Sequence, residues 1–216
     1  MSDRSFVSSE LRARVRLVAV PVALVLGRLG LTPNALTIVG FLGTCLAAIA
    51  AASQAWVLAG VLVIAFGIFD LFDGALARAT GQASRFGAFL DSTLDRTGES
   101  LVLAGVAYGS AAGGFTIGAG LAALALTFAS VVTYARAKAE ALGVHGEVGV
   151  APRPERLVVL SAGLVLAGIL GGVGAGAELR GGSIALSIAL GIIAVLSAIT
   201  VIQRILHVRQ QLDRKQ

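Results

Sequence analysis

The chain has 216 residues, of which 56% are hydrophobic and only 13% are charged. A soluble domain usually carries about 25% charged residues, so this composition excludes an ordinary soluble globular protein. The net charge of +5 does not indicate nucleic-acid binding, because the basic residues lie between hydrophobic runs and not on one soluble basic face.

The first segment, Ser9 to Leu29, is basic at its start and apolar only from Leu17 to Leu26. That apolar part is too short to cross a hydrocarbon core of about 30 Å. We therefore expect residues 1–30 to form a juxtamembrane segment with an amphipathic helix in the membrane interface. A seventh membrane span is the alternative.

Six long apolar runs follow, several of about the 20 residues that a membrane-spanning helix needs. They predict an all-α polytopic membrane protein, with one six-helix domain over residues 31–210 and a cytoplasmic tail at 211–216. The predicted spans are approximately Thr37–Ala52, Trp56–Ala77, Phe86–Ser110, Phe115–Glu140, Pro154–Val173 and Ser183–Val208.

The distribution of basic residues predicts the orientation of these spans. An even number of spans places both termini on the same side of the membrane. The basic residues at 4–28, 78–85, 136–156 and 204–215 lie on that side as well. The three links on the opposite side contain a single basic residue, Arg180. The positive-inside rule therefore predicts cytoplasmic termini and cytoplasmic charged loops in the cell membrane.

The second and third spans carry two pairs of aspartates at helical spacing: Asp70 with Asp73, and Asp91 with Asp95. Each pair lies on one helix face, and the short link at 79–85 makes the two helices neighbours. Four converging carboxylates would repel one another strongly, and divalent cations relieve that repulsion. We therefore expect a site for Mg²⁺ or Mn²⁺, with two ions about 4 Å apart that could clamp a pyrophosphate.

Other charged residues of these spans, Arg85, Arg96 and Glu99, are interpreted as helix-end or solvated charges. Gly74 leaves room for a ligand beside the helix, and Arg78 lies one turn further on, where a guanidinium could bind a phosphate.

The stretch from Asp70 to Asp95 reads D-x-x-D-G-x-x-A-R, eight residues, then G-x-x-x-D-x-x-x-D. It resembles the signature of the CDP-alcohol phosphatidyltransferases without a departure. The resemblance implies a six-helix membrane fold, usually a homodimer, with a cytoplasmic site open to lipid. It also implies attack of an alcohol on the CDP-linked phosphate of CDP-diacylglycerol, with release of CMP.

The resemblance also implies roles for single residues. Asp70, Asp73 and Asp91 correspond to metal ligands, and Asp95 corresponds to both a ligand and the general base. The positions that correspond to the family's CDP-lipid site are Asn34, Ala35, Leu36, Thr37, Gly74, Arg78 and Ser84.

Basic residues outside the signature favour a phosphorylated acceptor; they are Arg136, Lys138, Arg153, Arg156 and Arg204. The segments 134–140, 153–156 and 203–204 resemble the actinobacterial phosphatidylinositol-phosphate synthases, which implies inositol 1-phosphate as the acceptor. The lysine and arginine of the fourth span stand in exchanged order here.

Three alternatives stay open at this level. The basic residues could serve only as positive-inside anchors. Glycerol 3-phosphate could be the acceptor, as in a phosphatidylglycerophosphate synthase. A cation-coupled transporter would also place aspartates in the membrane, and metal-dependent release of CMP separates that function from the enzyme.

Overall fold

The computed structural model describes residues 20–150, 152–174 and 180–214. Within these ranges the secondary structure is helical, which confirms the all-α prediction. A short helical stretch at 20–28 is followed by α2 (Pro33–Ala52), α3 (Trp56–Thr80), α4 (Arg85–Ala112), α5 (Thr116–Ala141), α6 (Arg153–Ile169) and α7 (Gly181–Asp213).

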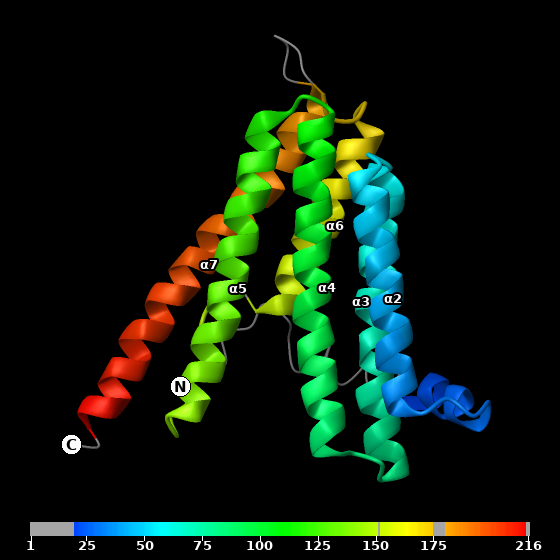
Figure 1. The fold of residues 1–216 in the computed structure, drawn as a ribbon, viewed down its shortest axis with the longest axis vertical. Helices are drawn as coiled ribbons and strands as arrows, with labels where there is room; N and C mark the ends of the chain where they lie inside the picture. The colour runs from blue at the N-terminus through cyan, green and yellow to red at the C-terminus, as the bar shows by residue number, and fades with distance from the viewer. Residues whose placement is uncertain (1–19, 151, 175–179, 215–216) are drawn as a thin grey trace.

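The six long helices form a closed ring in cross-section, with α2 packed on α3, α3 on α6, α6 on α7, α7 on α5, α5 on α4, and α4 on α2. Figure 1 shows that the α3–α4 link and the ends of α5 and α7 lie at one end of the bundle. The first residues of α6 lie further inside the bundle (Figure 1). This order places α4 and α6 on opposite sides of the ring's interior.

Local sequence determines where the helices begin and end. Thr32 caps α2 by accepting a hydrogen bond from Ala35 N–H at 3.2 Å, and Ser84 caps α4 by accepting one from Gly87 N–H at 2.9 Å. The predicted end of the fifth span at Val173 is wrong. Helix α6 ends at Ile169, because Gly171 and Gly172 adopt φ angles of 94° and 76° that reverse the chain.

Four helices, α2, α3, α5 and α7, are long and apolar enough to cross a membrane, and they identify the chain as a membrane protein. Helix α4 carries several charged residues, and α6 has only 17 residues. Whether these two helices also cross the membrane, as the six-span count requires, stays a prediction.

The predicted interfacial helix lies partly outside the described residues. Its described part, the helical stretch at 20–28, lies at a steep angle to the bundle beside the start of α2 (Figure 1). Ala23 of this stretch is buried together with Leu36, Ala75 and Leu76. Its location in the membrane interface stays a prediction.

Glycines in α4 allow close packing against α2. A Cβ atom added at Gly105 would lie 2.3 Å from the carbonyl oxygen of Ala48, a backbone atom that cannot move aside. We expect Gly105→Ala to lower the free energy of unfolding by about 1–3 kcal/mol, although alanine is the better helix former. Thermal unfolding in detergent measures this loss. Gly120→Ala in α5 is the matched control, since a Cβ there meets nothing within 4 Å; equal unfolding temperatures for the two variants would contradict the close-packing argument.

Candidate active site

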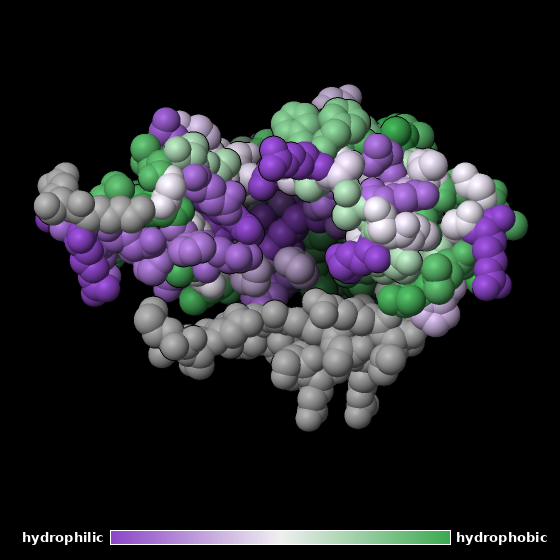
Figure 2. Space-filling view, turned by 90° about the horizontal axis from the view of Figure 1, so that it is seen from below, coloured by the Kyte–Doolittle hydropathy of each residue, from purple (hydrophilic) through white to green (hydrophobic). Residues whose placement is uncertain are grey.

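Hydrophilic side chains gather around a hollow at the end of the bundle where α5 and α7 finish (Figure 2). The predicted carboxylates are contributed by α3 and α4, two helices that are joined by the short link at 81–84. Gly81, with a φ of 68°, ends α3 and makes this short turn possible.

Three of the four predicted carboxylates converge. Asp70 of α3 and Asp91 and Asp95 of α4 each offer an oxygen atom, and these atoms all lie within 4.8 Å of one another. Asp91 and Asp95 are one helical turn apart, so they present their carboxylates on the same face of α4. The prediction that α3 and α4 are direct neighbours is wrong, because each of them packs along α2, which lies between them in the ring. The three side chains meet across the interior of the helix ring.

The fourth carboxylate, Asp73, is engaged differently. Its Oδ2 accepts a hydrogen bond from the hydroxyl of Thr37 at 2.6 Å, and its Oδ1 accepts one from the backbone N–H of Gly74. The residue is only 6% exposed. Asp73 thus joins α3 to α2, and its role as a metal ligand stays a prediction.

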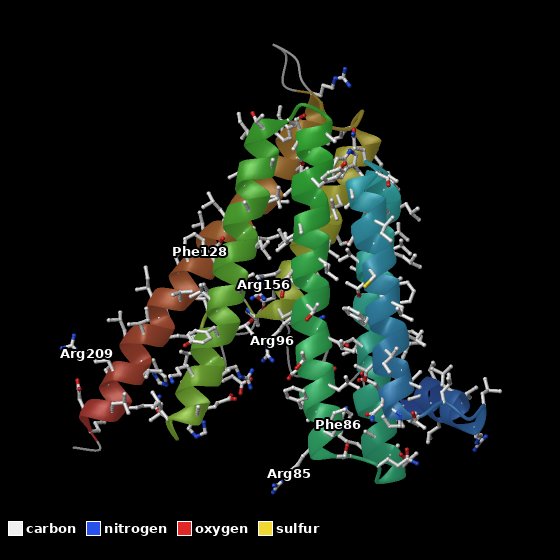
Figure 3. All side chains as sticks on the ribbon, viewed as in Figure 1. Arg85, Phe86, Arg96, Phe128, Arg156 and Arg209 are labelled. Atoms are coloured by element: carbon white, nitrogen blue, oxygen red, sulfur yellow. The ribbon has the colours of Figure 1, made fainter. Side chains whose placement is uncertain are left out.

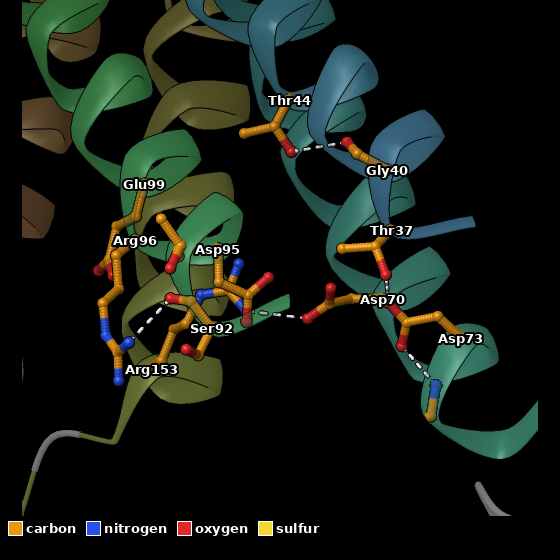
Figure 4. A network of polar contacts seen from close by, with 12 residues as sticks. Thr37, Gly40, Thr44, Asp70, Asp73, Ser92, Asp95, Arg96, Glu99 and Arg153 are labelled. Carbon is orange, nitrogen blue, oxygen red and sulfur yellow. Dashed lines mark hydrogen bonds and ion pairs between the residues drawn. The ribbon is translucent and has the colours of Figure 1, made fainter. Parts of the chain in front are cut away.

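Arg153, the first residue of α6, places its guanidinium among the carboxylates (Figure 4). Its Nη1 donates hydrogen bonds to Asp70 Oδ2 at 2.9 Å and to Asp95 Oδ2 at 2.5 Å. Both contacts are charge-assisted, the stronger class of protein hydrogen bonds. One guanidinium nevertheless balances only one of three negative charges.

The donor set fits a divalent cation. Oδ1 of Asp91 is buried and has no hydrogen-bond partner among the described residues. A buried carboxylate oxygen without a partner is unfavourable unless a cation or a proton compensates it. Three convergent carboxylates suit a hard ion such as Mg²⁺ or Mn²⁺.

The residues assigned to the CDP-lipid fall into three groups. Asn34 and Ser84 lie side by side at Gly87, where an added Cβ would be 3.1 Å from Asn34 Oδ1 and 3.0 Å from Ser84 Oγ. The guanidinium of Arg78 folds back over Gly74, with Nη1 3.2 Å from the corresponding Cβ position. Leu36 is 1% exposed and packs in the core, and Ala35 is the residue that donates to the Thr32 cap.

Of the five basic residues expected to bind the acceptor, the structure brings Arg153 to the carboxylates. Arg204 donates from Nε to the carbonyl of Val148 at 2.8 Å and from Nη1 to the carbonyl of Val132. Arg136 forms ion pairs with Glu140 and Glu147, and Lys138 is exposed to solvent. Arg204 and Arg136 therefore hold the loop after α5 against α5 and α7.

The fifth residue, Arg156, forms a buried ion pair with Glu99: Nε donates to Oε1 at 2.7 Å and Nη2 donates to Oε2 at 2.8 Å. The interpretation of Glu99 as a helix-end or solvated charge is therefore wrong, since Glu99 is only 5% exposed. The sequence did contain a signal that Glu99 faces the interior: it lies one turn after Asp95, so the two carboxylates share a face of α4.

Comparison with known proteins gives consistent results. The model of the CDP-alcohol phosphatidyltransferase family matches residues 30–203. A phosphatidylinositol phosphate synthase of Cutibacterium acnes is 39% identical over 88% of this chain and 91% of its own length. An archaetidylinositol phosphate synthase of Pyrococcus horikoshii is 35% identical over 95% of this chain and 98% of its own length.

Crystal structures of the phosphatidylinositol phosphate synthase of Mycobacterium tuberculosis share the fold at 32% sequence identity. The structure with CDP-DAG bound has a TM-score of 0.78 and covers 88% of this chain and 93% of that one. The structure in complex with manganese and citrate has a TM-score of 0.77 and covers 88% of each chain. Together with the match over residues 30–203 and the converging aspartates of the signature, these similarities show that the chain belongs to the CDP-alcohol phosphatidyltransferase family of enzymes.

Proposed function

We propose that this enzyme transfers the phosphatidyl group of CDP-diacylglycerol to inositol 1-phosphate, giving phosphatidylinositol phosphate and CMP. The observation that carries the proposal is the guanidinium of Arg153 between Asp70 and Asp95. A cation at this position could hold the phosphate of an acceptor while the acceptor's hydroxyl lies beside a carboxylate base. Family membership in turn argues against the transporter alternative.

The names of the relatives support the acceptor more strongly than the lipid. The synthases of Cutibacterium acnes and Pyrococcus horikoshii share inositol phosphate in their names and differ in the phosphatidyl or archaetidyl part. CDP-diacylglycerol as the donor rests on the Mycobacterium tuberculosis structure that contains CDP-DAG.

In the proposed site, Asp70, Asp91 and Asp95 hold divalent cations together with Asp73. Mg²⁺ or Mn²⁺, with two ions expected, would neutralise charge on the pyrophosphate as CMP is displaced from it. The CDP portion is received by Asn34, Ala35 and Thr37 at the start of α2 together with Gly74, Arg78 and Ser84, whereas the side chain of Leu36 packs in the core.

Asp95 accepts the proton of the acceptor hydroxyl, whose oxygen forms a bond to the lipid-linked phosphorus. The bond from that phosphorus to the oxygen of CMP breaks, and CMP leaves. Arg153 binds the acceptor's own phosphate and keeps the hydroxyl near Asp95. Lys138 and Arg204 add positive charge, whereas the charges of Arg136 and Arg156 are compensated by glutamates. A base must lie within hydrogen-bond distance of its proton, and Asp95 is one of the three converging carboxylates.

The basic residues are distributed unevenly along the bundle. Arg85 and Arg209 lie at the bundle end with the hollow (Figure 3). The C-terminal ends of α3 and α5, which carry Arg78, Arg136 and Lys138, lie at the same end, whereas α7 begins after Arg180 at the opposite end (Figure 1). This asymmetry supports a cytoplasmic site and cytoplasmic termini in the cell membrane, with six spans. A homodimer is proposed from the family resemblance alone.

An acceptor panel tests the proposed substrate. Purified enzyme with CDP-diacylglycerol and Mg²⁺ or Mn²⁺ is offered inositol 1-phosphate, glycerol 3-phosphate, serine or free inositol, and CMP release is measured. We expect activity with inositol 1-phosphate and little with free inositol, because the latter has no phosphate for Arg153 to bind. Activity with glycerol 3-phosphate alone would reject the proposed acceptor and make the enzyme a phosphatidylglycerophosphate synthase.

A further inference from the structure

The buried ion pair between Glu99 and Arg156 lies inside the bundle. The two residues are 5% and 4% exposed, and two parallel hydrogen bonds of 2.7 and 2.8 Å join them. Figure 3 shows Arg156 within the bundle, whereas Arg85 and Arg209 lie at its periphery. A charged pair in this position is costly to bury and contributes little to stability over an apolar pair of similar size. Stability alone therefore does not explain it.

The pair continues the arrangement that begins at the carboxylate cluster. Asp95 and Glu99 are one turn apart on α4, and Arg153 and Arg156 are one turn apart on α6. Asp95 binds Arg153, and Glu99 binds Arg156. Two consecutive carboxylate–guanidinium contacts therefore join α4 to α6 across the interior of the helix ring.

The start of α6 needs such an anchor. The residue before the helix is Pro152, whose side chain offers no hydrogen-bonding group to cap the first turn. The second residue is Pro154, which fixes φ and donates no backbone hydrogen bond. The bidentate contact between Arg156 and Glu99 fixes both the position and the rotation of this turn. The two parallel hydrogen bonds form only when the guanidinium and the carboxylate are coplanar and face each other.

We propose that Glu99 is a positioning residue for the acceptor site. By holding Arg156, it fixes the first turn of α6 and so places the guanidinium of Arg153 at Asp70 and Asp95. Glu99 does not touch the reacting atoms, and it acts through the two arginines. The inference rests on the proposed function, since it assumes that Arg153 binds the phosphate of the acceptor.

Glu99→Gln tests the proposal, because glutamine keeps the size of the side chain and one acceptor oxygen but removes the charge. We expect the KM for the acceptor to rise about tenfold, a change that corresponds to the loss of one well-oriented charged contact. The KM for the CDP-lipid and the affinity for Mn²⁺ are expected to stay within about twofold, since those ligands bind to groups on α2, α3 and α4. Glu99→Asp keeps the charge and should recover part of the acceptor affinity.

Asp213→Asn is the matched control. It removes the charge from a carboxylate that pairs with Arg209 at 3.7 Å on the exposed end of α7, and it should leave every KM unchanged. If Glu99→Gln does not fold, the double variant Glu99→Leu, Arg156→Leu replaces the whole pair by apolar side chains and restores the packing. A wild-type acceptor KM in either variant, or an equal rise in the KM values of acceptor and CDP-lipid, would overturn the positioning role.

These measurements separate the inference from the proposed function. The acceptor panel with wild-type enzyme identifies which phosphorylated alcohol is used, and the Glu99 variants are then compared with wild type on that alcohol. Glycerol 3-phosphate as the acceptor would reject the proposed substrate, and a selective rise in its KM would still support the role of Glu99. If only an unphosphorylated alcohol is used, both proposals are rejected.

Discussion

Asp95→Asn is expected to abolish transfer while binding of the CDP-lipid stays largely intact. Asparagine has the same shape as aspartate and can still accept the hydrogen bond that Arg153 donates to Oδ2 at 2.5 Å. It cannot accept the proton of the attacking hydroxyl. Loss of a general base lowers turnover by about a hundredfold to ten-thousandfold.

Two measurements on the same preparation check this result: release of CMP and binding of the CDP-lipid to the detergent-solubilised protein. Asp213→Asn again serves as a control, because it makes the same chemical change at an exposed site. Turnover at the wild-type rate would remove the assignment of Asp95 as the base. If CDP-lipid binding and turnover fall by the same factor, Asp95 serves in binding the lipid and not as the base.

Divalent cations are expected to stabilise the protein as well as to support its activity. Three carboxylates converge, the guanidinium of Arg153 contacts two of them, and Oδ1 of Asp91 is buried without a hydrogen-bond partner in the described structure. A cation that binds the folded protein at a concentration 100 times its Kd adds about 2.7 kcal/mol to the free energy of unfolding. We expect a chelator to lower the unfolding temperature and to abolish CMP release, and Mg²⁺ or Mn²⁺ to restore both.

Asp91→Asn tests whether Asp91 is one of the residues that bind the cation. In the presence of a chelator the variant should be at least as stable as wild type, because the substitution removes one of three mutually repelling charges. Addition of Mn²⁺ should stabilise wild type and have little effect on the variant. An equal Mn²⁺-dependent rise in unfolding temperature for both proteins would show that Asp91 is not a ligand.

The site was predictable from the sequence to different degrees. Asp91 and Asp95 had to share a face of one helix, because they are one turn apart. The short link at 81–84 did not determine the approach of Asp70, since α3 and α4 each pack along α2 and their carboxylates meet across the interior of the ring. The engagement of Asp73 with Thr37 was not predictable in the same way, since Thr37 lies 36 residues away on another helix. Local spacing determines which groups share a helix face, whereas partners across helices depend on how the helices pack.

The same limit applies to the basic residues. Arg153 and Arg156 have the same predicted role in the sequence, yet Arg153 reaches the carboxylates and Arg156 forms a buried pair with Glu99. The two arginines are three positions apart on α6, so they reach different levels of α4. This difference arises only once α6 is placed opposite α4 in the ring of helices.

The sequence by itself determined that this is an all-helical membrane protein with a carboxylate site of the CDP-alcohol phosphatidyltransferase type, because hydrophobic length and aspartate spacing are local properties of the chain. The tertiary structure alone decided which charges meet. It placed Arg153 among the carboxylates and buried Glu99 against Arg156, while Arg204 was drawn to the backbone carbonyls of Val132 and Val148. In the bundle interior a charged group must find a partner within a few ångströms, and helix packing determines which partner is near.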